Sequence, residues 1–184
     1  MKKTLLTILC TVLVCSCVMG ATLAYLADKT DSVTNTFTVG DIEIDLEETT
    51  GDEYKMVPGA TIAKDPTVTV AAGSEACYVF VKIDKTNNVD TYISYSVDDR
   101  WEPLTGVDGV YYCKLGNVGD TLAETVIPVL TDDKVTVNTG ITKAQLEAAD
   151  ANKPTLTFTA YAVQQQSLTL EQAWTQALTA SNYS

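Results

Sequence analysis

The sequence contains no histidine among its 184 residues. This absence removes the most common general base, the most common zinc ligand and every catalytic triad that depends on an imidazole. Basic residues are also scarce, with 12 lysines and arginines against 24 aspartates and glutamates and a formal net charge of −12. Duplex nucleic acid and a bare anionic membrane would repel such a chain. We therefore expect no nucleic-acid partner, and we predict that the protein is not an enzyme, with no catalytic residue, cofactor or metal site.

The N-terminal segment has the pattern of an export signal. Two lysines precede a run without charged residues that ends at Ala27. Thr22-Leu23-Ala24 places small residues at the positions that signal peptidases read, −3 and −1 from the cut. We predict cleavage between Ala24 and Tyr25, so that residues 1–24 are a signal peptide. The mature protein is then secreted and keeps no stable membrane anchor.

Two other interpretations of the leader stay open. Its charge-free run is long enough for a helix that crosses a membrane, so an uncleaved signal anchor has to be considered. Val14-Cys15-Ser16-Cys17 partly resembles a lipobox, which would make Cys17 a lipidated N-terminus. The chain stays apolar after Cys17 instead of turning to a polar tether, and this counts against lipidation.

Cleavage after Ala24 leaves two of the five cysteines, Cys77 and Cys113, in the mature chain. Both lie in strand-like runs, so a disulfide is feasible in an exported protein if those strands are neighbours. The alternative is a pair of buried free thiols. The sequence leaves both open because it does not supply the Cα–Cα separation.

Short apolar runs separated by turn residues fill the mature chain, which predicts a mostly β protein. Phe37 and Val39 have odd numbers and Ile42 and Ile44 have even ones, so they would point to opposite faces of a regular strand. We predict a bulge or bend at Gly40-Asp41 that brings them to one face, between two half-buried strands. Residues 77–83 are apolar on both faces, which is typical of a central strand of a sandwich. Further strands are expected at residues 66–70, 91–97, 109–115, 125–130 and 156–164.

Two capping boxes predict two short helices. Thr142 with Gln145 opens the first, and Thr169 with Gln172 opens the second. Apolar residues at helical spacing over residues 170–178 form a stripe that we expect to pack on the chain's own strands. The predicted fold is an antiparallel β-sandwich with two short helices, in a domain of residues 35–184 that follows an N-terminal extension of residues 25–34.

The densest acidic cluster follows the predicted bend. Its members alternate along one strand face and then run together, and they are Asp41, Glu43, Asp45, Glu47 and Glu48. No EF-hand or comparable loop spacing is present. We interpret the cluster as a solvated strand face, and calcium binding by these acids stays open.

Several segments resemble one protein family. Residues 21–48, ATLAYLADKTDSVTNTFTVGDIEIDLEE, look like the leader junction and first strands of the TasA and camelysin family of exported Gram-positive proteins. MVPGATIAKDPTVTV and GSEACYVFVKI are similar to the family's next block. TFTAYAVQ and the helix after it resemble the C-terminal block of clostridial-type members.

The resemblance implies a jelly-roll-like β-sandwich that is cut by a SipW-type signal peptidase and secreted to the surface or biofilm matrix of a Gram-positive bacterium. In the TasA branch, subunits assemble into fibres by donor-strand exchange, in which the N-terminal segment of one subunit completes the sheet of the next. If this chain assembles in the same way, the resemblance implies that the donor strand is Tyr25 to about Val33, with Tyr25, Leu26 and Val33 as apolar anchors. The partners would be other copies or related matrix subunits.

Two rival functions remain beside this one. The chain could be a monomeric cell-surface or accessory binding module. The camelysin branch is classed as a metallopeptidase, and that role would need a metal site built from carboxylates alone, since the chain has neither histidine nor an HExxH motif.

Overall fold

The structure is a computed structural model that describes residues 41–51 and 54–181. The chain divides into two units, Met1–Thr38 and Val39–Ser184, and every described residue belongs to the second. The predicted cleavage site, the extension of residues 25–34, the strand around Phe37 and Val39 and the bend at Gly40 lie outside the described residues.

Strands dominate the described part of the chain, as predicted. No helix in it is long and apolar enough to cross a membrane. The strands are β1 (Ile44–Glu47), β2 (Thr61–Ala63), β3 (Thr67–Val70), β4 (Cys77–Lys85), β5 (Ile93–Ser94), β6 (Glu102–Pro103), β7 (Val110–Leu115), β8 (Thr125–Pro128), β9 (Lys134–Val137) and β10 (Leu156–Gln164). The helices are α2 (Val89–Tyr92), η1 (Thr131–Asp133), α3 (Lys143–Ala151) and α4 (Leu170–Ser181).

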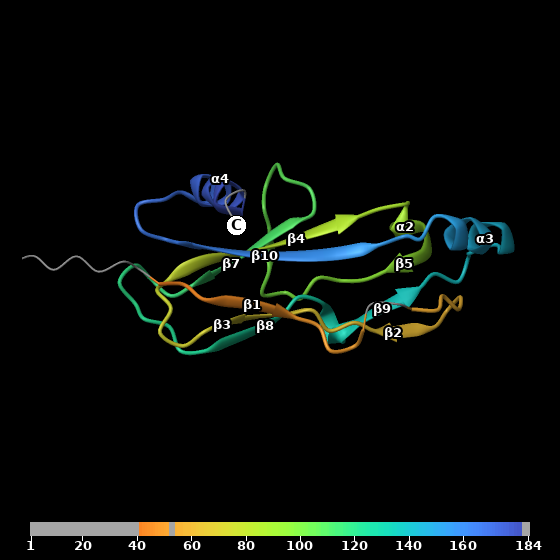
Figure 1. Ribbon diagram of the computed structural model, residues 1–184, viewed down its shortest axis with the longest axis horizontal. Helices are drawn as coiled ribbons and strands as arrows, with labels where there is room; N and C mark the ends of the chain where they lie inside the picture. Colours follow the sequence, from red (N-terminus) through yellow and green to blue (C-terminus); the bar gives the residue numbers. More distant parts are fainter. Residues whose placement is uncertain (1–40, 52–53, 182–184) are drawn as a thin grey trace, which may run out of the picture. The chain divides into compact units, whose positions relative to one another are not determined.

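The strands form three antiparallel sheets that are compatible with a β-sandwich. One sheet has the order β10-β4-β7-β6, and the other two have the orders β1-β3-β8 and β2-β9-β5. Figure 1 shows the two three-stranded sheets following one another along the face opposite the four-stranded sheet. The chain passes between these two smaller sheets three times, from β1 to β2, from β2 to β3 and from β8 to β9.

The main core lies between these layers. Side chains from one face of β4 meet side chains from β3, β8 and β9. Ile42, Ile44 and Leu46 pack against this core while the acids that alternate with them are exposed, so the predicted alternation is confirmed. Strand β4 has neighbours on both sides, β10 and β7, as expected for a central strand.

A second core lies on the other face of the four-stranded sheet, where α4 covers it (Figure 1). Ala173, Trp174 and Ala177 are buried against Phe80 of β4 and Val163 of β10. This confirms that the apolar stripe packs on the chain's own strands, except at its last residue, Leu178, which is 39 % exposed. The capping boxes also form: Gln145 N donates to Thr142 Oγ1 at 3.3 Å, and Gln172 N donates to Thr169 Oγ1 at 3.3 Å.

The predicted strand over residues 91–97 is wrong for most of its length. Asn87 and Asn88 adopt positive φ values of 49° and 55°, and a helical turn, α2, follows them. Only β5 and an isolated bridge at Val97 remain extended in this run. The left-handed backbone conformation of the two asparagines turns the chain here, and a prediction from β propensity alone does not detect that turn. The short strands β2, β6 and β9 were not predicted.

Candidate functional site

Strand β10 is a long, open sheet edge. It runs for nine residues and, in the part of the chain that the structure describes, pairs with β4 alone. The other edge strands, β1, β2, β5, β6 and β8, have four residues or fewer. An open edge of this length presents a row of unpaired main-chain groups that a further strand can use.

The register of β10 shows which groups face outward. Gln165 N donates to Ala76 O at 3.1 Å, and Thr155 O accepts from Thr86 N at 3.1 Å, so odd-numbered residues bond to β4. In an antiparallel pair the bonded residues alternate. The even-numbered residues therefore direct an N–H and a C=O to the open edge, and they are Leu156, Phe158, Ala160, Ala162 and Gln164.

A second open edge lies beside the first. Strand β1 pairs only with β3 among the described residues, and it lies next to β10 across the sandwich. Figure 1 shows β1 in orange alongside β10 in blue. Among the described residues, the edges of both layers are thus open on the same side.

Lys64 connects the two edges. Its side chain is largely buried, and its Nζ lies 2.5 Å from Glu48 Oε1 just after β1. The same ammonium lies 5.6 Å from the ring centroid of Phe158 on β10 and 5.2 Å from that of Tyr54. Burying a lysine requires such partners, since an unpaired charge in this position would be strongly disfavoured. Lys64 therefore holds the end of β1 close to β10.

Asp65 anchors the loop that follows β1. Its carboxylate accepts hydrogen bonds from the Thr49 hydroxyl at 2.5 Å and the Thr50 hydroxyl at 2.8 Å, and from both backbone amides at 3.0 Å. These bonds, chiefly the one from the Thr49 hydroxyl, favour the ionised form and lower the pKa of Asp65 to about 2. The loop at the end of β1 is thus tied to the start of β3.

The two mature cysteines lie on neighbouring strands, as the disulfide prediction requires. Cys77 is opposite Leu115 and Cys113 is opposite Val79, so the two occupy diagonal positions on one face of the sheet. Both are free thiols in the structure. Burial raises the pKa of Cys77 to about 11, and burial also raises that of Cys113. Whether the two pair in the exported protein stays open, as it did from the sequence.

The candidate metal ligands are dispersed. In residues 41–51 and 54–181, no group of three or more His, Cys, Asp or Glu residues is placed to hold a metal ion. Asp41, Glu43, Asp45 and Glu47 are exposed, in agreement with a solvated strand face. The predicted cleavage residues Ala24 and Tyr25 and the donor residues Leu26 and Val33 lie outside the described residues.

One comparison with known proteins identifies the family. Residues 1–99, more than half of the chain, match the family described as camelysin metallo-endopeptidase. No curated protein and no solved structure matches the chain. The matched residues include β1 to β5, and the open edge strand β10 lies beyond them. The predicted relationship is confirmed: the chain belongs to the TasA and camelysin family.

Proposed function

We propose that this chain is a structural protein of the extracellular matrix of a Gram-positive bacterium and that it assembles into fibres by donor-strand exchange. A SipW-type signal peptidase releases it at Ala24-Tyr25. The freed segment from Tyr25 to about Val33 of one copy then pairs with strand β10 of the next. The observation that carries the proposal is the nine-residue open edge of β10.

The energies of strand addition make the apolar anchors necessary. Ten outward main-chain groups on β10 allow on the order of ten hydrogen bonds, each with a net worth of about 1 kcal/mol. Association costs about 4 to 15 kcal/mol, so these bonds alone leave little surplus. Burial of Tyr25, Leu26 and Val33 adds about 1.5 to 3 kcal/mol for each side chain. Hydrogen bonds then define the register and the anchors provide the affinity.

The geometry of such a contact leads to a filament. The donor segment and the acceptor strand are different parts of the chain, so the interface is heterologous. A head-to-tail contact that does not close into a ring propagates from subunit to subunit. The same edge would let related matrix subunits join the fibre.

Ala160→Pro tests the acceptor strand. The Ala160 N–H faces the open edge, so proline removes a group that a donor strand needs without removing a bond to β4. We expect filaments of the released protein, seen by negative-stain microscopy and sedimentation, to disappear. Ala160→Ser keeps the N–H and serves as the matched control. Thermal unfolding of the two variants checks that the sandwich is intact.

Deletion of residues 25–33 tests the donor segment in the same assay. Loss of filaments in both the deletion and Ala160→Pro supports the exchange. A released protein that starts at Tyr25 and stays monomeric contradicts fibre formation and leaves the monomeric binding module. Filaments that persist in Ala160→Pro but not in the deletion would exclude β10 as the acceptor.

The family's description favours peptidase activity as a second candidate. Catalytic zinc in proteins is usually held by three protein ligands, with histidine prominent among them. The sequence has no histidine, and the described residues lack a cluster of three candidate ligands. The side chains that could act as metal ligands therefore do not fit the usual metallopeptidase centre. Casein cleavage by purified protein that is lost with a chelator and restored by a divalent metal would establish the activity despite this.

A further inference from the structure

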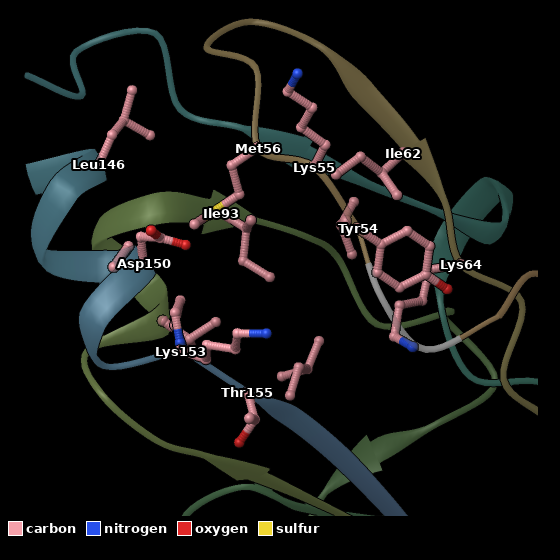
Figure 2. A pocket seen from close by; sticks show the side chains of 15 residues that line it. Tyr54, Lys55, Met56, Ile62, Lys64, Ile93, Leu146, Asp150, Lys153 and Thr155 are labelled. Atoms are coloured by element: carbon pink, nitrogen blue, oxygen red, sulfur yellow. The ribbon is translucent and has the colours of Figure 1, made fainter. Parts of the chain in front are cut away.

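A cleft of about 790 Å³ opens at the end of the sandwich that holds α3. Figure 2 shows its walls, with Leu146 and Asp150 of α3 on one side and Ile62 of β2 and Tyr54 on the other. Its volume falls within the range of small-molecule sites in proteins, about 300 to 1,000 Å³. It adjoins the end of the sheet edge proposed for assembly, since Leu156 of β10 and the Lys64 and Tyr54 side chains also line it.

Apolar side chains make up most of the lining. Val89, Val135 and Ala149 are buried in its floor. Met56, Ile62, Ile93, Leu146 and Leu156 are only half-buried, so their outer surfaces face the cleft. Half-exposed apolar surface gathered from five separate segments is unfavourable in water, and covering it would stabilise a bound apolar group.

Two opposite charges face the same space from one wall. Figure 2 shows the Lys153 side chain reaching toward the middle of the cleft and the Asp150 carboxylate turned toward it, while Lys55 points away. No ion pair within 4.0 Å involves Lys153 or Asp150 among the described residues. Lys64, at the opposite wall, is already paired with Glu48. The cleft therefore offers one ammonium and one carboxylate that have no partner of opposite charge within the described chain.

We propose that this cleft binds a short apolar peptide with free termini. Lys153 would pair with the ligand's carboxylate and Asp150 with its ammonium, while apolar side chains of the ligand cover Met56, Ile62 and Leu146. A fatty acid has no group for Asp150, and an alkylammonium has none for Lys153. A zwitterion with an apolar body is the ligand class that complements both charges and the lining.

The test uses trileucine and two blocked forms, acetyl-trileucine and trileucine amide, titrated calorimetrically into protein expressed from the full 184-residue sequence and purified as the producing cell processes it. Acetylation removes the ligand's ammonium, and amidation removes its carboxylate. Each exposed ion pair contributes up to about a fivefold change in affinity. We expect Lys153→Gln to weaken the binding of trileucine by up to about fivefold and to leave the binding of trileucine amide unchanged, because the amide has no carboxylate for Lys153. Asp150→Asn should weaken the binding of trileucine to the same extent and leave that of acetyl-trileucine unchanged, because the acetyl form has no ammonium for Asp150.

Lys143→Gln is the matched control, because Lys143 lies at the start of α3, whose C-terminal end precedes Lys153, and its side chain is 91 % exposed and outside the cleft. Leu146→Ala should weaken all three ligands, since it removes apolar lining and no charge. Absence of saturable trileucine binding overturns the proposal. Equal affinity for trileucine and both blocked forms, or an equal effect of Lys143→Gln and Lys153→Gln, overturns it as well.

Discussion

The docking of α4 on the four-stranded sheet makes Trp174 a strong test of the fold. Trp174 is 8 % exposed, and its ring centroid lies 5.3 Å from that of Phe80 and 5.5 Å from that of Tyr161. Replacing a buried tryptophan by alanine typically costs about 3 to 5 kcal/mol, and the loss of two aromatic contacts favours the upper part of that range. A loss of this size is a large share of the stability of an ordinary domain, about 5 to 15 kcal/mol.

Urea unfolding measures this loss directly. The chain has two tryptophans, so Trp174→Ala leaves Trp101 as the fluorescent reporter, buried in the main core with its Nε1 donating to Pro128 O at 2.9 Å. We expect a loss of about 4 kcal/mol, together with a fall in Tm of about 8 to 16 °C. Leu178→Ala on the same helix is the control, because Leu178 is 39 % exposed and should cost far less. A loss below about 1 kcal/mol, or one equal to that of Leu178→Ala, would refute the second core.

Two further predictions concern titratable groups. The pKa of Asp65 is lowered from 3.8 to about 2, so its anchoring of the loop is complete above pH 4 and is lost as the pH falls through 2. Asp65→Asn should therefore lower the urea midpoint at pH 7 and change it much less at pH 2, where about half of the Asp65 carboxylates are protonated, and a constant difference would contradict this. Diagonal strand positions are about 7 to 8 Å apart between Cα atoms, whereas disulfides need less than about 7 Å. We expect Cys77 and Cys113 to give two thiols per chain with Ellman's reagent in urea and to react slowly in the native protein at pH 8, because the pKa of Cys77 is raised to about 11. Absence of thiols in urea would establish the disulfide instead.

Much of the secondary structure could be predicted from local patterns. Alternation placed Ile44 and Leu46 on the core face, and apolar residues on both faces identified β4 as a central strand. The capping boxes of Thr142 and Thr169 located two helix starts, because an N-terminal turn depends on residues only three positions apart. The strand predicted over residues 91–97 was wrong because the backbone conformation of the two preceding asparagines, and not β propensity, determines the turn there.

The candidate sites depended on packing. The donor segment was predicted from the resemblance to the TasA branch together with the predicted cleavage site, but its proposed acceptor required knowing that β10 lies at the edge of its sheet. Strand order is a property of contacts between segments far apart in the chain, and sequence alternation is the same for an edge strand as for a half-buried inner one. Lys64 and Phe158 illustrate the same limit, since nothing in their local sequences indicates that they meet.

By itself, the sequence determined that the chain is acidic, that it lacks histidine and that it begins with an export-like leader. It also carries the residues that relate the chain to camelysin and TasA. It also determined most strands and both long helices, because these follow from periods of two and 3.6 residues that neighbouring positions reveal. Only the tertiary structure decided which edges stay open, which thiols lie diagonally and which charges face a common cleft. These features arise from the packing of the two layers, in which each residue's neighbours come from segments that are far apart in the sequence.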